Sequence, residues 1–353
     1  MEIALFQQKI DDFEIRLPNA QTLESAEELR QEIEDLRPAL ETLSEDHPLR
    51  FCWVKSLVAI LIRLGSIYYE DLKNQTKAFQ YYRQAQQEDV QWRQELGENS
   101  QIDFQTFHWK TSVNIAVSYS VMGELGEAEA ILWSLNDEIE KAIAHAQGQP
   151  DKVIREIYDV EGIVKNEILF EISLAYFDED QGIEAREPMI LEMINKLTTA
   201  AENKIEGSYI LSPKLRAQIW LNCAEAFNRM GQRSNKGEFE QAISYLEKLE
   251  ALADSIDINL LTHSQIQKAE IYQIQGAIES AIPIFVSTLE NQQVDSFRRC
   301  YAGYCLGQTY QKQGDKDAAK KVYQYAMKIY RLDRDGVPNE LVNDMKKALD
   351  SLK

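Results

Sequence analysis

The chain has 353 residues, of which 44% are hydrophobic and 27% charged, an ordinary globular usage that excludes wholesale disorder. Its 58 acidic residues against 38 basic ones give a formal net charge of −20, which excludes a general nucleic-acid binder, because affinity for phosphate backbones comes from clustered Lys and Arg. With only 15 Gly and 8 Pro, the chain has few tight turns, which favours helices joined by short loops over a many-stranded sheet.

The N-terminal segment, residues 1–47, is acidic and is expected to be helical. Its clearest helical stretch is LESAEELRQEIEDL, and Pro38 is expected to break or kink the chain after it. The first residues, MEIALFQQKIDDFE, have no basic region and become acidic too soon for a signal peptide. No uncharged run reaches the roughly 18 apolar residues of a membrane span. We therefore expect a cytoplasmic protein that does not enter the membrane.

One pattern recurs between residues 48 and 332. It begins with LGSIYYEDLKNQTKAFQYYRQA and returns in NIAVSYSVMGELGEAEAILWSL, in a degenerate form around ILFEISLAYFDED, in WLNCAEAFNRMG and in QKAEIYQIQGAIESAIPIFVSTL. Each unit has an anchor aromatic on its first predicted helix, and a small residue comes three positions before it in most units. The six anchors are Tyr68, Tyr119, Tyr176, Phe227, Tyr272 and Tyr310.

The last unit, CYAGYCLGQTYQKQGDKDAAKKVYQYAMKIY, shows the pattern most clearly. Gly307 is expected to let a second helix approach closely, because it has no side chain. Gly314 is expected to end the first helix in a left-handed conformation, which Gly adopts without a steric penalty. The second helix then presents small and aromatic residues towards the first. The residues that define this unit are Leu306, Gly307, Tyr310, Gly314, Ala319, Tyr323 and Ala326.

This spacing, L-G-x-x-Y-x-x-x-G-x-x-x-x-A-x-x-x-Y-x-x-A, resembles the tetratricopeptide repeat. The resemblance implies an all-α fold, a right-handed superhelix of antiparallel helix pairs, with about six units over residues 48–332. The anchors are 51, 57, 51, 45 and 38 residues apart, whereas the standard unit has about 34. Longer helices and loops must therefore absorb the excess. Residues 333–353 contain PNELVNDMKKALDSL, whose apolar stripe predicts a C-terminal capping helix.

In tetratricopeptide superhelices the first helices line a concave groove that often holds peptides. The resemblance therefore implies that polar residues on these helices bind the partner. Asn114 and Asn222 fall at the same motif position in different units, where an amide can both donate to and accept from a peptide backbone. The predicted partner-binding residues are Lys110, Asn114, Gln218, Asn222, Gln267, Glu270, Tyr301, Tyr304 and Gln308.

A carboxylate clamp of the Hsp90-binding type is rejected. The unit after Lys110 and Asn114 has Glu167 and Glu171 at the matching positions, and these carboxylates would repel a C-terminal carboxylate.

Catalytic and metal-binding motifs are missing from the sequence. It has no GxxxxGK[ST], GxSxG, HExxH or GxGxxG segment, and its four histidines are widely scattered. The cysteines Cys52, Cys223, Cys300 and Cys305 form no CxxC pair and are expected to be buried reduced thiols. We therefore expect no enzyme activity, no metal and no cofactor.

Three functions stay open at this point. The leading one is a scaffold or adaptor that binds a protein or peptide in the groove. The alternative is a peptide-responsive regulator resembling bacterial pheromone receptors with a helical effector region, and an enzyme built on a helical toroid is a weaker third.

The partner is expected to be a neutral to basic polypeptide, neither a nucleic acid nor a membrane. The charge is uneven, because residues 1–50 carry 13 acidic and 5 basic side chains, whereas residues 298–353 carry 7 acidic and 12 basic ones. This asymmetry leaves open a merely solvated surface, electrostatic choice of partner, or a head-to-tail homo-oligomer.

Overall fold

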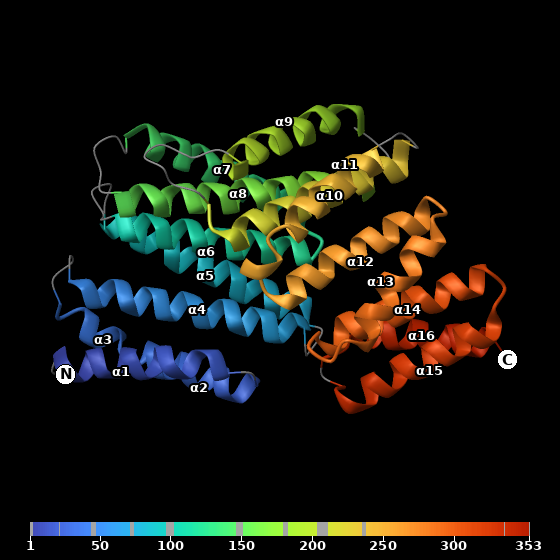
Figure 1. The fold of residues 1–353 in the computed structure, drawn as a ribbon. Helices are drawn as coiled ribbons and strands as arrows, with labels where there is room; N and C mark the ends of the chain where they lie inside the picture. Colours follow the sequence, from blue (N-terminus) through green and yellow to red (C-terminus); the bar gives the residue numbers. More distant parts are fainter. Residues whose placement is uncertain are drawn as a thin grey trace. The chain divides into compact units, whose positions relative to one another are not determined.

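The computed structural model describes residues 3–20, 22–43, 47–70, 74–96, 102–145, 151–178, 183–202, 211–234, 238–334 and 336–352. These residues form helices and contain no strand, so the all-α prediction is confirmed for them. The chain divides into two compact units, Met1–Ala175 and Tyr176–Lys353. Figure 1 labels the helices of both.

The first unit runs from α1 to α8, the last turn of which passes into the second unit. Its elements are α1 (Ile3–Arg16), η1 (Leu17–Asn19), α2 (Leu23–Glu34), α3 (Arg37–Leu40), α4 (Pro48–Glu70), α5 (Gln75–Leu96), α6 (Ile102–Val121), α7 (Leu125–His145) and α8 (Asp151–Asp178).

The second unit holds the remaining helices. They are α9 (Ile183–Glu202), α10 (Pro213–Ser234), α11 (Glu238–Glu250), η3 (Ala253–Ser255), α12 (Ile258–Ile274), α13 (Ile278–Glu290), α14 (Ser296–Lys312), α15 (Lys316–Leu332) and α16 (Asn339–Ser351). The side chain of the anchor Tyr176, predicted for the degenerate unit on α8, lies outside the described residues.

Consecutive helices pair as the repeat pattern predicts. In the first unit α4 packs on α5 and α6 on α7, and in the second α10 packs on α11, α12 on α13 and α14 on α15. A short turn joins α14 to α15, so the two run antiparallel. Gly307 of α14 faces the ring of Tyr323 on α15, where a Cβ atom would collide with the ring, and Gly65 has the same relation to Tyr82. The predicted close approach at Gly307 is confirmed.

Three glycines, each four residues after an anchor aromatic, have the backbone that only glycine adopts easily, and the left-handed conformation predicted for Gly314 is confirmed. Gly123, Gly276 and Gly314 have φ angles of 82°, 77° and 81° and follow the ends of α6, α12 and α14. Gly231 stands at the same distance from the anchor Phe227 but ends no helix, because α10 continues past it to Ser234. It lies instead against the ring of Phe239, about 3.0 Å from where its Cβ would be, so its smallness serves helix packing.

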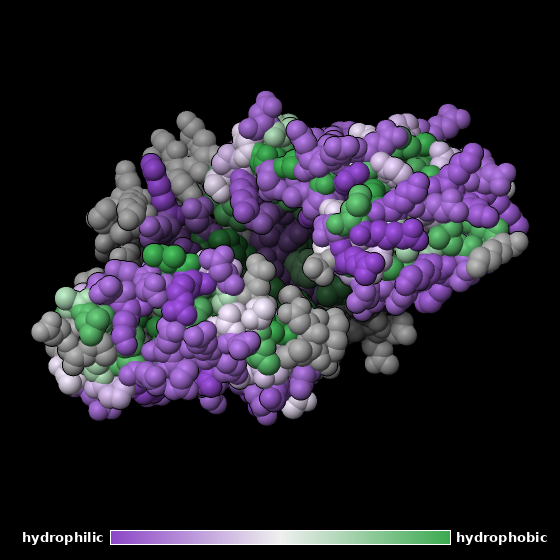
Figure 2. All heavy atoms as spheres, turned by 90° about the horizontal axis from the view of Figure 1, so that it is seen from below, coloured by the Kyte–Doolittle hydropathy of each residue, from purple (hydrophilic) through white to green (hydrophobic). Residues whose placement is uncertain are grey.

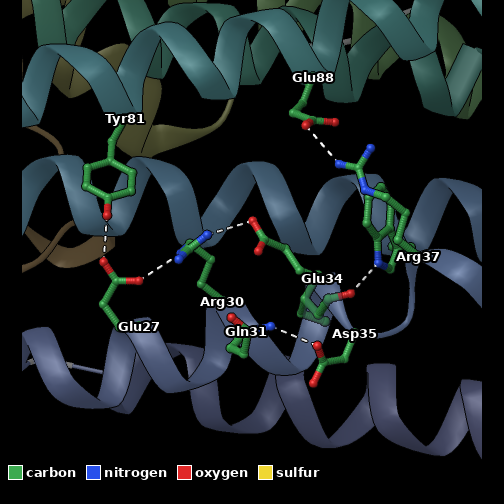
Figure 3. A network of polar contacts seen from close by, with 10 residues as sticks. Glu27, Arg30, Gln31, Glu34, Asp35, Arg37, Tyr81 and Glu88 are labelled. Carbon is green, nitrogen blue, oxygen red and sulfur yellow. Dashed lines mark hydrogen bonds and ion pairs between the residues drawn. The ribbon is translucent and has the colours of Figure 1, made fainter.

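The N-terminal segment packs on the first helix pair. Pro38 lies in the first turn of the short helix α3, which begins at Arg37 after α2 has ended at Glu34, so the helical path is interrupted before this proline. Helix α2 lies on α4, and the indole N–H of Trp53 donates to the carbonyl oxygen of Ile33 at 2.6 Å. Side chains also reach α5: the Tyr81 hydroxyl donates to Glu27 at 2.5 Å, and Arg37 pairs with Glu88 at 2.9 Å (Figure 3).

These contacts continue in a short network along α2. Arg30 bridges Glu27 and Glu34, with both ion pairs at 2.7 Å (Figure 3). Glu27 and Glu34 are therefore held in place by the packing of this segment.

The C-terminal helix α16 closes the other end. It packs on α15 and α14, and Val342 and Met345 are fully buried against them. Its apolar stripe joins the core of the last two helix pairs. Between α5 and α6, His108 shares a buried hydrogen bond with Asp89, so this histidine belongs to the core.

One described helix, α4, is long and apolar enough to cross a membrane by length and composition alone. Most of that stretch, 61%, is buried inside the protein, and α4 packs on α2, α5 and α6. On the face in Figure 2, hydrophobic side chains form small separate patches among hydrophilic ones.

Candidate functional site

The first helices of the second unit, α10, α12 and α14, contact one another in sequence order. Because each repeat presents the same helix position at the same height, equivalent residues of successive repeats become neighbours. Two positions before the anchor aromatics stand Glu225, Glu270 and Gln308, and all three are half-buried. We call the surface of α10, α12 and α14 around them the first-helix face.

Equivalent hydrogen bonds join the neighbouring helices of this face. The Gln267 amide of α12 donates to Glu225 of α10 at 3.5 Å. One repeat later, the Cys305 thiol of α14 lies 3.8 Å from Glu270 of α12, at the equivalent pair of positions. The hydroxyl of Tyr301 also donates to Glu270, at 2.6 Å. A carboxylate therefore accepts a bond from the next repeat at both junctions.

A further bond links α12 and α14 one turn along. The Gln273 amide donates to the Thr309 hydroxyl at 2.8 Å, and this hydroxyl in turn donates to the carbonyl oxygen of Cys305 at 2.8 Å. Thr309 is fully buried, so this bond satisfies a polar group that would otherwise be costly to bury. These junction bonds hold the three helices in one register.

Burial shifts the pKa values of two titratable side chains near the first-helix face, Glu270 and His263. It raises the pKa of Glu270; the Tyr301 hydrogen bond opposes this rise and the charge of Glu225 adds to it. Burial lowers the pKa of His263, and the nearby Arg298 guanidinium lowers it further. Glu225 pairs with Arg229 one turn away on the same helix.

The predicted partner-binding residues are distributed over both units. Gln218 is exposed near the start of α10, whereas Gln267 is 8% exposed and is engaged in a junction bond. Lys110 and Asn114 are exposed on α6, in the first unit. The half-buried members are Asn222, Glu270, Tyr301, Tyr304 and Gln308.

Glu225, Arg229 and Thr309 were not among the predicted residues. The sequence does contain a signal for Glu225, because it stands two positions before its anchor aromatic as Glu270 does. For Thr309 there is no such signal, since its contact with Gln273 depends on how α12 and α14 pack. Helix α10 is capped at its start by Ser212, whose hydroxyl accepts from the Leu215 N–H at 3.3 Å.

The first unit has an acidic pair on α8, at the positions that led us to reject a carboxylate clamp. Glu167 and Glu171 lie one turn apart, and Glu171 is only 2% exposed. Burial raises the pKa of Glu167 to about 7, and the neighbouring Glu171 adds to the rise. Glu167 is therefore close to half-protonated at neutral pH.

Metal and thiol chemistry find little support in the described part of the chain. No three side chains of the His, Cys, Asp or Glu type are grouped so that they could hold a metal ion there. The four cysteines are free thiols, three of them buried and Cys52 half-buried. Burial raises the pKa of Cys223, and it raises that of Cys300 to about 11, so neither is a thiolate at neutral pH.

Comparison with known families identifies the repeats. The sequence model of the tetratricopeptide repeat matches residues 58–89, which cover most of α4 and α5, and residues 304–331, which cover the second half of α14 and nearly all of α15. Both segments are tetratricopeptide repeats. Repeats of this family generally mediate protein–protein interactions. The second match contains Gly307, Gly314 and Tyr323, the residues on which the sequence pattern was clearest.

Solved structures with a similar fold have low sequence identity to this tetratricopeptide-repeat chain. The apo form of RapI is 13% identical, with 99% of this chain and 86% of that chain covered and a TM-score of 0.49. TTC0263 from Thermus thermophilus, a thermophilic tetratricopeptide-repeat protein, is 15% identical over 68% of this chain and 98% of that one, with a TM-score of 0.42.

PH0952 from Pyrococcus horikoshii is a signal transduction ATPase with numerous domains that has a tetratricopeptide repeat sensor. It is 14% identical over 97% of this chain and 52% of that chain, with a TM-score of 0.42. No curated protein sequence matches the chain.

Proposed function

We propose that the chain is a non-catalytic scaffold or adaptor that binds a polypeptide along the first helices of its tetratricopeptide repeats. The observation that carries the proposal is the set of junction bonds from Gln267, Tyr301 and Gln273, which fix α10, α12 and α14 in one register. A face whose helices are held in advance loses less conformational entropy when a ligand binds.

The polar residues of the first-helix face have two different proposed roles. Gln267, Glu270 and Tyr301 connect the helices, whereas Gln218, Tyr304 and Gln308 present exposed or half-buried polar groups to a ligand. A polypeptide suits such a face, because its backbone supplies a donor and an acceptor at every residue. Lys110 and Asn114, exposed on α6, are proposed to serve the same purpose in the first unit.

The partner is proposed to be neutral to basic and the location cytoplasmic. The net charge of −20 attracts a basic partner and repels nucleic acid and anionic membrane surfaces. Free cysteines fit a reducing compartment, since disulfides are rare there.

A double variant tests the amides at the shared motif position. Asn114→Ala with Asn222→Ala is expected to weaken the partner's affinity about tenfold, because two hydrogen bonds contribute roughly 0.5–1.5 kcal/mol each. The partner is first captured from native lysate and identified by mass spectrometry, and affinity is then measured by titration calorimetry.

The matched control removes two exposed amides from second helices, Gln80→Ala on α5 with Gln241→Ala on α11. The control should bind as the wild type does, and circular dichroism should show unchanged helix content for both variants. Wild-type affinity in the Asn114 and Asn222 variant would move the site away from the first helices. A co-purified short peptide, in place of a large partner, would support the alternative of a peptide-responsive regulator.

A further inference from the structure

Helix α15 carries a row of alternating cationic and apolar side chains on its exposed side. Lys321, Tyr325, Lys328 and Leu332 follow one another at intervals of four, three and four residues, so they are neighbours along the helix surface. Tyr325 is 42% exposed and Leu332 is 89% exposed. We call these four residues the α15 row.

The cations of the α15 row have no acidic partners within the described residues. Neither Lys321 nor Lys328 forms an ion pair or a hydrogen bond there, although acidic residues are abundant in the chain. Many cations elsewhere are paired, such as Arg30 with Glu27 and Lys248 with Glu202. The positive charges of Lys321 and Lys328 therefore take part in no ion pair within the described part of the chain.

Helix α1 carries a row of the opposite charge. Leu5, Gln8, Asp12 and Ile15 follow one another at intervals of three, four and three residues, and Asp11 lies beside them. Leu5 is 47% exposed and Ile15 is 72% exposed. Asp12 pairs with Arg16 at 3.1 Å, whereas Asp11 accepts from the neutral amide of Gln7 at 2.6 Å. We call Leu5, Gln8, Asp11, Asp12 and Ile15 the α1 row.

The two rows contain the most exposed large hydrophobic side chains of the described residues, Leu332 and Ile15. Within the α15 row Leu332 lies one turn from Lys328, and within the α1 row Ile15 lies one turn from Asp11 and Asp12, so the charged members of the two rows have opposite signs. Burying them against each other would remove apolar surface from water while Lys321 and Lys328 meet Asp11 and Asp12. The α1 row lies in the first unit of the chain and the α15 row lies in the second.

We propose that the α1 row of one copy docks on the α15 row of a second copy, so that the protein associates head to tail. Such a contact joins two different surfaces, and it therefore builds a chain or a ring of copies. A polyanion such as nucleic acid would use the α15 row alone and would be repelled by the net charge of −20. A second copy uses both rows.

Sedimentation velocity of the full chain over a concentration series tests the proposal. Near 20 mM salt the mean mass is expected to rise with protein concentration, and near 500 mM salt it is expected to fall back towards the monomer, because salt screens exposed charges. A monomer at every concentration would overturn the proposal, and so would an oligomer whose mass is insensitive to salt.

Charge reversal identifies the two rows. Lys321→Glu with Lys328→Glu, and separately Asp11→Lys with Asp12→Lys, are each expected to weaken self-association about tenfold or more. An equimolar mixture of the two variants should associate again, because each reversed row then finds an opposite row on the other variant. Misfolding of the whole chain could weaken the single variants but would not produce this recovery.

The control is Lys214→Glu with Lys312→Glu, two exposed lysines of α10 and α14 that change the net charge by the same amount as the α15 variant. It should associate as the wild type does. If the control weakens association as much as the α15 variant, or if the folded mixture stays monomeric, the assignment to these rows is wrong.

Discussion

Gly307 shows how a single residue sets the distance between paired helices. A Cβ atom at this position would collide with the ring of Tyr323, which is itself fully buried and has no room to move. Gly307→Leu is therefore expected to lower the free energy of unfolding by roughly 1–3 kcal/mol or more through overpacking. Thermal unfolding measures the loss. Gly126→Leu is the control, since no atom lies within 4 Å of the Cβ position there. Equal melting temperatures for the two variants would contradict the role of Gly307.

Glu167 makes the stability depend on pH. The unfolded chain releases this proton near its ordinary pKa of 4.5, whereas burial in the folded chain raises the pKa to about 7. The folded state thus holds the proton more tightly, so this stabilisation is fully present below about pH 4.5 and is lost as the pH rises through about 7. The loss is on the order of 3 kcal/mol when complete.

Glu167→Gln removes the titration while keeping the shape of the protonated side chain. We expect the variant and the wild type to unfold at similar urea concentrations at pH 4, and the variant to be the more stable at pH 8. Glu28→Gln, at an exposed glutamate of α2, should not show this divergence. A wild type that equals the Glu167 variant at pH 8 would show that Glu167 ionises in the fold without cost.

At the scale of the element, α16 decides whether the last helix pair is closed off from water. Met345 is fully buried in the core that α14, α15 and α16 share. Met345→Ala is expected to cost about 2–5 kcal/mol, because it removes packed methylene groups and leaves a cavity. Urea unfolding followed by circular dichroism measures the cost. Lys346→Ala, on the exposed side of the same helix, should have little effect, and an equal loss in both variants would mean that helix propensity and not packing was changed.

At the scale of the whole molecule, the net charge of −20 should influence how the partner binds. If the partner is basic, as proposed, titration calorimetry should show affinity falling as salt rises from about 50 to 500 mM, because ions screen exposed charges beyond a Debye length of roughly 10 Å at 0.1 M. Affinity that does not change with salt would point to an apolar interface.

The sequence by itself determined the helical class, the pairing of the helices and several of the turns. These features depend on residues a few positions apart: Gly314 ends α14, and Gly307 meets Tyr323 across a short turn. Spacing over such short distances is fixed by helix geometry, so it can be read directly from the residues. Gly231 shows where such short-range spacing stops being informative. A glycine at this motif position ends the helix in other repeats, whereas Gly231 lies inside α10 and makes room for the ring of Phe239.

Only the tertiary structure decided which polar groups connect the repeats and which are presented to solvent. Gln267 was predicted to bind a partner, yet its amide bonds to Glu225, and Tyr301 likewise bonds to Glu270. The two residues of each hydrogen bond are 42 and 31 residues apart in the sequence. The loops between them differ in length, so sequence spacing does not predict which side chains meet. The division at Ala175 and Tyr176 was also invisible in the sequence, because it falls inside the continuous helix α8. Contacts between repeats depend on how whole helices pack, and local spacing does not encode that packing.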